Sequence, residues 1–563
     1  MQKTTKRRFS LLLAAVMAFG SVAFAATANA AQTDPVPVAA DSYGLPDKIE
    51  DGAILHCWCW NFNTIKANLP RIAQAGFKSI QTSPINEIKK GDGGKMSLKS
   101  TNKGNWWYQY QPTDYTIGNY MLGTEDEFKE MCAEAHKYGI KVIVDIVANH
   151  CSSDESVISN HVKTITQGTG KTFHDRLEIS DWSNRRQITQ GKLTGLMDLN
   201  TQNSYVQQMI VDYMANVRAD GADGFRFDAA KHIELPDDDA GFAGNFWPTV
   251  LNNDAEFQYG EILTGGDRAA DYAKLMKITA DAYGSNLRTA LEKKKLTATS
   301  AKNYRLTGVD AKQIVTWVES HDNYCTDDNP SQNQYSSWYI LNNEQIQQGW
   351  AVIAAQGDTT PLFFARPKGS TAGPNGSKWG QNTIGLDGDE NYYSDEVVAV
   401  NKFRNAMVGE SKTLSDVIKQ KLTMIERGSK GVCLVNVADE NTNINVATKL
   451  ADGEYTDHAN GGIFTVKDGK LTGTVPAGGV TVLYQEEEPG PEILVGDING
   501  DKVVNITDAT LLQRHLAEFK YADGTLIVDE SDPKSSKIAD FNCDNYIDIN
   551  DVTAMQRMVA EFD

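Results

Sequence analysis

The sequence has few cysteines, no excess of basic residues and almost no long apolar runs, and each shortage excludes a class of protein. Its 563 residues include only 7 cysteines, too sparse for a disulfide scaffold. Lys and Arg number 54 against 74 Asp and Glu, a net charge of -20, which argues against general binding to a nucleic-acid backbone. Mean hydropathy is -0.42, and the long apolar run is confined to the N-terminus, so a mostly membrane-embedded protein is excluded.

The first thirty residues have the pattern of a secretory signal peptide. Four bases and no acid precede the apolar run LLLAAVMAFGSVAFA (11–25), and Ala28-Asn29-Ala30 offers a cleavage site. A basic region, an apolar region and an A-x-A pattern are typical of such leaders. We therefore predict that residues 1–30 are removed and that the mature chain is secreted, with no membrane segment. An uncleaved N-terminal anchor is the alternative.

The cysteines show neither a disulfide framework nor paired zinc-ligand spacing. Their number is odd, so at least one thiol is free in a secreted chain. Cys57 and Cys59 in HCWCW lie two residues apart and would share one face of a strand. We interpret the set as buried free thiols.

Short apolar runs alternate with helical patterns along residues 48–408. The runs at 53–60, 77–84 and 141–147 predict buried strands, and residues 125–140 have an amphipathic helical pattern ending near Gly139. Continuous Val and Ile runs favour strands buried on both faces, as in a parallel sheet. Further candidate strands lie at 222–229, 256–263, 313–320 and 360–367. This repeated βα pattern predicts an α/β fold, a closed (β/α)8 barrel, with an open doubly wound sheet as the alternative.

The remaining segments differ from the barrel region in composition and in the pattern of apolar residues. Residues 31–47 form a leader, and about 149–200 is a polar stretch that predicts an inserted domain B. Residues 409–485 alternate apolar runs with Gly, Asn and Asp, which predicts an antiparallel β-sandwich, domain C. The charged, proline-containing segment 486–493 predicts a linker. Residues 494–563 form a separate module.

That last module contains an internal duplication. GDINGDKVVNITDATLLQRHLAEF (496–519) aligns with ADFNCDNYIDINDVTAMQRMVAEF (539–562) at a constant offset of 43 residues. Each copy begins with oxygen-bearing side chains at positions 1, 3, 5, 9 and 12 of a twelve-residue loop, the clustering that calcium requires. No clear helical pattern precedes either loop, and position 6, usually glycine, is Lys502 or Asn545. The predicted ligands are Asp497, Asn499, Asp501, Asn505 and Asp508 in the first copy, and Asp540, Asn542, Asp544, Asp548 and Asp551 in the second.

Carboxylates recur at the ends of the candidate barrel strands. Asp228 ends GFRFD, Glu261 lies in YGEIL and Asp322 ends WVESHD. Because the carboxyl ends of barrel strands carry the active site, these acids are candidate catalytic groups. Arg226 precedes Asp228 by two residues, so it shares a strand face with that carboxylate and favours its ionised form.

Taken together, the motifs resemble the conserved regions of the α-amylase family, glycoside hydrolase family 13. DIVANH (145–150), GLMDLN (195–200), GFRFDAAKH (224–232), YGEIL (259–263) and WVESHD (317–322) follow one another in order. The likeness extends from about residue 50 to 485 and is strongest with saccharifying amylases of the Bacillus subtilis type. It implies a retaining mechanism on starch, with two closely spaced carboxyls and a covalent intermediate.

The resemblance implies a role for each matching residue. Asp228 matches the nucleophile, Glu261 the general acid/base and Asp322 the third carboxylate that holds the distorted sugar. The residues matching substrate contacts are Arg226, His150, His321, Tyr110, Gln111, Trp107, Lys231 and His232. Trp58, Trp60 and Trp106 are more simply explained by packing, because large aromatic side chains bury readily.

The same resemblance implies one structural calcium in the catalytic domain. Asn149 and Asp198 match its side-chain ligands, and Thr189 and His232 match its main-chain carbonyl ligands. Some relatives also bind chloride through an Asn directly before the histidine of the last motif. That position is Ser320 here, so we predict that activity does not depend on chloride.

The terminal duplication resembles a type I dockerin, the module that binds cohesin domains of a scaffoldin. This implies two further calcium ions, a cohesin partner, and localisation outside the cell or on its surface through a scaffoldin. Gln513-Arg514 and Gln556-Arg557 occupy equivalent positions, which suggests binding in two orientations. A calcium-dependent stabiliser of the enzyme is the alternative for this module.

For the whole chain the sequence predicts endo-hydrolysis of α-1,4-glucosidic bonds in starch and related glucans. A related α-glucan transglycosylase or debranching enzyme of the same fold is an alternative, because the motifs do not fix the choice of acceptor. A non-catalytic starch-binding subunit is the alternative from another class.

Overall fold

The computed structural model describes residues 43–99, 104–175, 177–263, 268–325, 336–485, 494–542 and 546–561. The predicted signal peptide (1–30), most of the predicted leader and the whole predicted linker (486–493) lie outside these residues, as do Cys543, Asp544 and Asn545. Among the helices of the described residues, none has the length and apolar character needed to cross a bilayer.

Eight parallel strands close into a barrel, in the order β1-β15-β14-β13-β12-β11-β6-β2. The predicted (β/α)8 barrel is therefore confirmed, and the open doubly wound sheet is excluded. Its strands are β1 (Ile54–Cys57), β2 (Ser79–Thr82), β6 (Lys141–Ile146), β11 (Gly224–Phe227), β12 (Phe257–Gly260), β13 (Lys277–Thr279), β14 (Ile314–Trp317) and β15 (Thr360–Phe364).

The barrel strands are shorter than the predicted runs, since they span three to six residues, and two of them differ in more than length. No strand was predicted at β13, which has only three residues and no extended apolar run to mark it. The run 53–60 is a strand only to Cys57, because the chain turns there and Cys59 takes a left-handed φ of 62°. Cys57 and Cys59 therefore do not share a strand face. The six described cysteines are all buried and free, as interpreted from the sequence.

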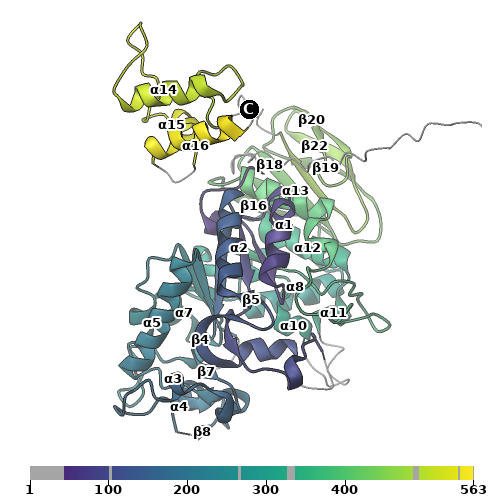
Figure 1. Ribbon diagram of the computed structural model, residues 1–563. Coiled ribbons are helices and arrows are strands. Elements are labelled where there is room, and N and C mark those ends of the chain that lie inside the picture. Colours follow the sequence, from purple (N-terminus) through teal and green to yellow (C-terminus); the bar gives the residue numbers. More distant parts are fainter. Residues whose placement is uncertain are drawn as a thin grey trace, which may run out of the picture. The chain divides into compact units, whose positions relative to one another are not determined.

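Helices follow the strands and cover the barrel, and α1 and α2 run side by side (Figure 1). Helix α2 begins at a capping box between Thr124 and Glu127 and ends before Gly139, whose φ of 69° suits glycine. The helices of this region are α1 (Phe62–Gln74), α2 (Glu125–Lys137), α5 (Ser204–Ala219), α6 (Phe246–Val250), α7 (Ala269–Tyr272), α8 (Asp281–Glu292), α9 (Ala298–Lys302), α10 (His321–Cys325), α11 (Ser337–Ile340), α12 (Asn343–Ala354) and α13 (Asp395–Ala406).

Two excursions leave the barrel near the ends of β2 and β6. The first forms a sheet of β3 (Asn86–Ile88), β4 (Pro112–Asn119) and β5 (Gly123–Thr124). The second covers most of the predicted domain B and contains α3 (Asn160–Lys163), α4 (Arg185–Gln190) and two small sheets. These sheets pair β7 (His150–Cys151) with β10 (Met197–Asp198), and β8 (Leu177–Glu178) with β9 (Gly191–Lys192).

Alternate side chains of the strands fill the barrel interior. Ile54, Ile143, Phe257, Val315 and Leu362 belong to one buried cluster, while a larger cluster lies between strands and helices. Because the interior is packed, the barrel has no pore, and a site can form only at an end of the strands.

After α13 the chain forms two antiparallel four-stranded sheets, which confirms the predicted β-sandwich architecture. One orders β16 (Lys412–Ile418), β17 (Leu422–Arg427), β18 (Gly431–Asn436) and β23 (Val480–Tyr484). The other orders β19 (Thr442–Ala447), β22 (Lys470–Val475), β21 (Ile463–Lys467) and β20 (Gly453–Thr456). Arg427 of β17 donates to the carbonyls of Ala355 and Met407, just beyond the ends of α12 and α13.

The duplicated module contains α14 (Ile506–Leu516), α15 (Pro533–Ala539) and α16 (Ile549–Glu561). Its own small core includes Ala509, Leu512, Val528, Val552 and Met555. Helix α15 directly precedes the second loop, which corrects the expectation that neither loop follows a helix. The signal was present in the sequence, because Asp532 caps Lys534 and Ser535 and proline follows it at the first helical position.

Candidate active site

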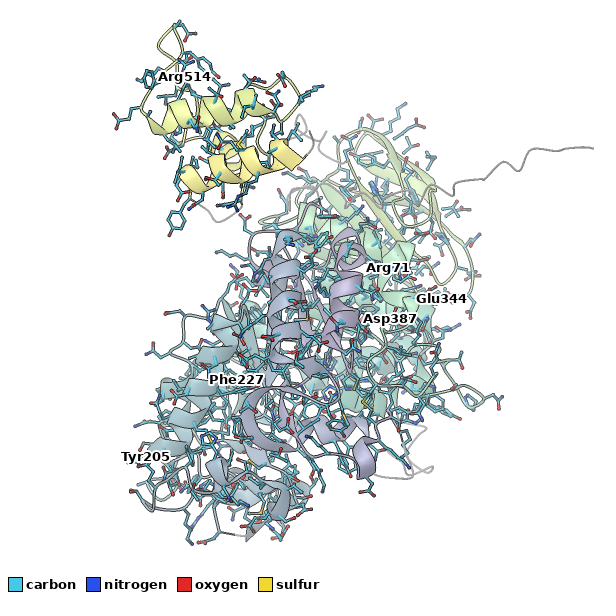
Figure 2. All side chains as sticks on the ribbon, in the orientation of Figure 1. Arg71, Tyr205, Phe227, Glu344, Asp387 and Arg514 are labelled. Carbon is cyan, nitrogen blue, oxygen red and sulfur yellow. The ribbon has the colours of Figure 1, made fainter. Side chains whose placement is uncertain are left out.

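Three carboxylates converge on one buried guanidinium at the carboxyl ends of β6, β11 and β12. Arg226 Nη1 lies 2.8 Å from Asp145 Oδ1 and 2.9 Å from Asp228 Oδ1, and Nη2 lies 2.6 Å from Glu261 Oε1. Phe227, labelled in Figure 2, ends β11, so Asp228 is the first residue beyond the strand. The register pairs Phe227 with Ile146 and with Gly260, which brings Asp228 and Glu261 to the same edge.

His321 and Asp322 open α10, a few residues beyond β14. The His321 ring stacks on the Tyr110 ring with centroids 5.2 Å apart and an interplanar angle of 6°. His321 Nε2 lies 3.5 Å from Asp322 Oδ1. The third predicted carboxylate is thus at the same end of the barrel as the other two.

Tyr110 and His150 lie beside these acids and line the same cavity. The Tyr110 hydroxyl donates to Asp145 Oδ2 at 3.0 Å. His150 Nε2 lies 3.1 Å from the Tyr110 carbonyl oxygen and 3.9 Å from Asp228 Oδ2. These contacts fix the tyrosine ring and the imidazole relative to the Asp228 carboxylate.

Burial shifts the pKa values of the site in opposite directions for acids and bases. Desolvation raises the pKa of Glu261 to about 8, against the attraction of Arg226 and with the help of nearby Asp322 and Asp228. Desolvation, together with the Arg226 charge, lowers the pKa of His321 to about 3. Despite its burial, Arg226 has a pKa well above its usual range, because Asp145, Glu261 and Asp228 surround it. Near neutral pH, Glu261 is therefore largely protonated and His321 is neutral.

The acids open into a cavity of about 600 Å³. Its walls include Asp228, Glu261 and Asp322, and every predicted substrate residue except Arg226, which lies behind the carboxylates: Trp107, Tyr110, Gln111, His150, Lys231, His232 and His321. Trp58 and Trp60 are buried, 2 % and 1 % exposed, as the packing interpretation predicts. Trp106, by contrast, also lines the cavity.

Two residues of the site were not predicted from the sequence. Asp145 is fully buried and pairs with Arg226, and its position as the first residue of DIVANH was an available signal. Trp182 lines the cavity from the inserted segment and remains 49 % exposed. Its ring lies 5.8 Å from Lys231 Nζ and edge-on to His232. No motif surrounds Trp182, so the sequence carried no signal for it.

The residues expected to hold a calcium in this region come together between the inserted segment and the barrel. Asp198 Oδ1 is buried and has no hydrogen-bond partner among the described residues, while Oδ2 is 2.7 Å from His174 Nδ1. Leu199 N donates to the Asn149 carbonyl, and His232 Nδ1 lies 2.9 Å from the carbonyl of Ile188, the neighbour of Thr189. Within the described chain, no group of three or more His, Cys, Asp and Glu could hold a metal ion. The expected calcium site does not require such a group, because its ligands are one carboxylate together with amide and carbonyl oxygens. The partnerless Asp198 oxygen fits a hard cation.

The two loops of the terminal module fold alike where both are described. In the first, the backbone N–H groups of Asn499 and Asn505 donate to the two oxygens of Asp508. In the second, Asn542 and Asp548 donate in the same way to Asp551.

The first loop also brings its other predicted ligands together. Asp497 accepts from the backbone N–H groups of Asp501 and Lys502, while Asn505 caps α14. Lys502 takes a left-handed φ of 69°, as expected at a position that usually holds glycine. Of the second set, Asp540 lies directly after α15, and Asp544 is outside the described residues.

Comparison with known proteins agrees with this geometry. Residues 59–345 match the family model "Alpha amylase, catalytic domain", and residues 495–560 match "Dockerin type I domain". The chain is 40 % identical over 478 residues to an alpha-amylase of Butyrivibrio fibrisolvens, covering 78 % of this chain and 48 % of the relative. It is 37 % identical over 462 residues to an alpha-amylase of Clostridium acetobutylicum, covering 80 % and 56 %. The chain thus spans about half the length of these relatives.

Solved structures share the fold at lower identity. Wild-type alpha-amylase I from Eisenia fetida aligns with a TM-score of 0.65 at 19 % identity, covering 78 % of this chain and 98 % of that one. An acarbose complex of alpha-amylase from Geobacillus thermoleovorans aligns with a TM-score of 0.58 at 17 % identity, covering 78 % and 99 %. Family match, barrel and converging acids agree: the chain belongs to the alpha-amylase family and carries a C-terminal type I dockerin domain.

Proposed function

We propose that this protein is a retaining α-amylase that cleaves internal α-1,4-glucosidic bonds of starch and related glucans. The observation that carries the proposal is the convergence of Asp228, Glu261 and Asp322 on one cavity at the barrel edge. Two of these carboxyls contact the same guanidinium, that of Arg226. Such closeness suits retention, which needs carboxyls only about 5–5.5 Å apart.

In this mechanism Asp228 attacks the anomeric carbon. Its Oδ1 lies 2.9 Å from Arg226 Nη1, and this contact holds the carboxylate in place for the attack. The bond to the leaving sugar breaks as the bond from Asp228 forms, which gives a covalent glycosyl-enzyme. Its hydrolysis by water regenerates Asp228.

Glu261 is the general acid and then the general base. Burial raises its pKa to about 8, so a proton is available for the departing glycosidic oxygen at neutral pH. Once that proton has left, the carboxylate accepts a proton from the water that attacks the intermediate.

The remaining residues hold the sugar. Asp322, His321 and His150 would bind hydroxyl groups of the ring at which the bond breaks, and Tyr110 would stack beneath that ring, beside Gln111 and Trp107. Lys231 and His232 would contact the leaving-group side. Trp182 lies against both and would extend that side with an aromatic face.

Calcium has a structural part in the proposal. Asn149, Asp198 and the carbonyls of Thr189 and His232 would hold one ion, which would neutralise the buried Asp198 carboxylate and tie the inserted segment to the barrel. The dockerin loops would hold two more ions. With calcium bound, the dockerin would attach the enzyme to a cohesin domain of a scaffoldin, outside the cell.

A reducing-sugar assay on soluble starch tests the function, together with product analysis from amylose and pullulan. We expect internal cleavage of amylose and no action on the α-1,6 bonds of pullulan. Asp228→Asn should lower the rate by several orders of magnitude, because no other group can form the intermediate. Debranched products or transferred glucans would favour the related enzymes instead, and no release of sugar by the wild type would leave a starch-binding subunit.

A further inference from the structure

A second buried ion pair lies just beyond the carboxyl ends of β14 and β15. Arg366, just beyond β15, is 3 % exposed, and Glu319, just beyond β14, is 2 % exposed. Arg366 Nε lies 2.6 Å from Glu319 Oε1, and Nη2 lies 2.8 Å from Oε2. This bidentate geometry is the strongest that the two side chains can form. Neither residue lines the cavity, so any effect on substrate must pass through other groups.

The rest of the Arg366 guanidinium is also engaged. Nη1 donates to the carbonyl of Leu341 at 3.1 Å, and Nη2 donates to the carbonyl of Ser337 at 3.3 Å. The guanidinium therefore contacts the first residue of α11 and the residue that follows its last. The guanidinium carbon lies 5.4 Å from the centre of the Tyr324 ring, within cation–π distance. One side chain therefore joins β14, α10 and α11.

These contacts flank the pair His321 and Asp322. Glu319 precedes His321 by two residues, and Tyr324 follows Asp322 by two. Tyr324 has a second anchor, since its hydroxyl donates to the Lys378 carbonyl and Lys378 Nζ donates to the Cys325 carbonyl. The chain that presents His321 and Asp322 to the cavity is thus held at both ends, and Arg366 takes part at each.

We propose that Glu319 and Arg366 are positioning residues that set where His321 and Asp322 meet the sugar at the cleavage point. The Asp322 side chain is short and half-buried. A small shift of its backbone would therefore move the carboxylate away from the sugar hydroxyls that it must hold. Misplacement by about 1 Å costs on the order of a hundredfold in rate. The pair therefore acts on the geometry of the transition state, and this role rests on the function proposed above.

The test compares Glu319→Gln and Arg366→Lys with the wild type, using kcat and KM on a maltooligosaccharide and the melting temperature. Gln keeps the shape of Glu319, and Lys keeps the charge of Arg366 but loses the bidentate fork. We expect kcat to fall about 10- to 100-fold while KM changes less than about threefold. The matched control is Arg404→Lys, since Arg404 is also buried and, within the described part of the chain, its hydrogen bonds go to backbone carbonyls, those of Gly52, Glu50, Ala354 and Thr359. It should lower the melting temperature without lowering kcat.

A second readout separates this proposal from the proposed function. In an Asp322→Asn background, Arg366→Lys should have little further effect on kcat, because the group that it positions is already lost. Acarbose affinity, measured by calorimetry, should fall about tenfold or more in Arg366→Lys and remain unchanged in Arg404→Lys. Equal losses of kcat in Arg366→Lys and Arg404→Lys, or full additivity with Asp322→Asn, would overturn the positioning role. If the wild type cleaves no glucan, the proposed function fails, and unchanged acarbose affinity in Arg366→Lys would then overturn the positioning role separately.

Discussion

Arg226 contacts three buried carboxylates, and burial raises the pKa of two of them against its attraction. Its Nη1 atom bonds both oxygens of Asp145 and one of Asp228, whereas Glu261 meets Nη2. Burial still raises the Glu261 pKa to about 8. Burial also raises the pKa of Asp145 to about 7. One cation among three acids cannot neutralise them all, so a proton held within this cluster balances the buried charge. In the mechanism proposed above, a proton on Glu261 serves as the acid.

The first prediction follows from that proton. Glu261 must be protonated to act as an acid, so kcat/KM on starch should fall about tenfold per pH unit above its pKa, near pH 8. Glu261→Gln should lower starch hydrolysis by about a thousandfold or more, since it can neither donate nor accept a proton. A maltotrioside with a nitrophenyl leaving group needs no acid and should lose less. A rate profile over pH 5–10 with both substrates measures this.

The control for this profile is Glu130→Gln, the same substitution at a surface carboxylate that is 62 % exposed and pairs with Lys66. It should leave both limbs of the profile unchanged. An equal loss on both substrates in Glu261→Gln would contradict an acid role for this residue.

Single residues differ in how well the sequence predicts them. Asp228, Glu261 and Asp322 follow β11, β12 and β14, so the strand pattern and the family motifs both pointed to one end of the barrel, where the cavity lies. Trp182 belongs to a segment without motif or periodicity, and only the fold of the inserted segment brings it to the cavity. Arg366 also has no local signal, because its partner Glu319 lies 47 residues away in sequence.

At the scale of elements, long apolar runs predicted their strands and short ones did not. The run at 141–147 is a strand over Lys141–Ile146, because continuous Val and Ile favour a strand buried on both faces. Strand β13 has three residues and pairs through only two positions on each side. Pairing with its neighbours β12 and β14 makes this segment a strand, whereas its local sequence does not predict one. The same holds for Cys59, whose left-handed turn ends β1 early.

The first dockerin loop offers a prediction at this scale. Lys502 has a φ of 69°, a conformation that costs a residue with a Cβ about 1–2 kcal/mol. Lys502→Gly should remove that strain and keep the backbone N–H that donates to Asp497 at 2.8 Å. Glycine also raises the entropy of the unfolded chain, which offsets part of the gain in stability. The net gain should be about 0.5–1 kcal/mol. Calorimetry of the full chain with calcium should show the transition of this module rising by roughly 2–8 °C.

Val503→Gly is the matched control, because Val503 is adjacent and exposed and has no left-handed φ. That change relieves no strain and only adds freedom to the unfolded chain, so it should lower the same transition. If Lys502→Gly also lowers it, the left-handed conformation is not the source of strain in the loop.

At the scale of the whole molecule, the acidity of the chain is unevenly distributed. Residues 494–563 contain 14 acidic and 6 basic side chains, and the two loops bring several of these acids onto short turns. Asp508 and Asp551 are fully buried in equivalent positions. Like charges so close together repel unless a cation binds between them. The small core of this module cannot offset such repulsion as readily as the barrel can.

We therefore predict that chelation unfolds the C-terminal module first and leaves the barrel folded. In calorimetry with excess EDTA, the transition of the module should move to lower temperature or disappear, because ligand release removes its binding free energy. The barrel should lose stability only through its own proposed site at Asp198. Capture on immobilised cohesin should fail in EDTA and return with calcium.

Truncation after residue 488 separates docking from stabilisation. If the module serves attachment, the truncated enzyme should keep its starch hydrolysis rate and its barrel melting temperature within error but lose all cohesin capture. The matched full-length control is Asp508→Asn with Asp551→Asn, which keeps both helices and removes one buried charge from each loop. It should behave as the truncation does in capture and as the wild type does in hydrolysis. A drop in barrel stability in either protein would instead assign the module to stabilising the enzyme.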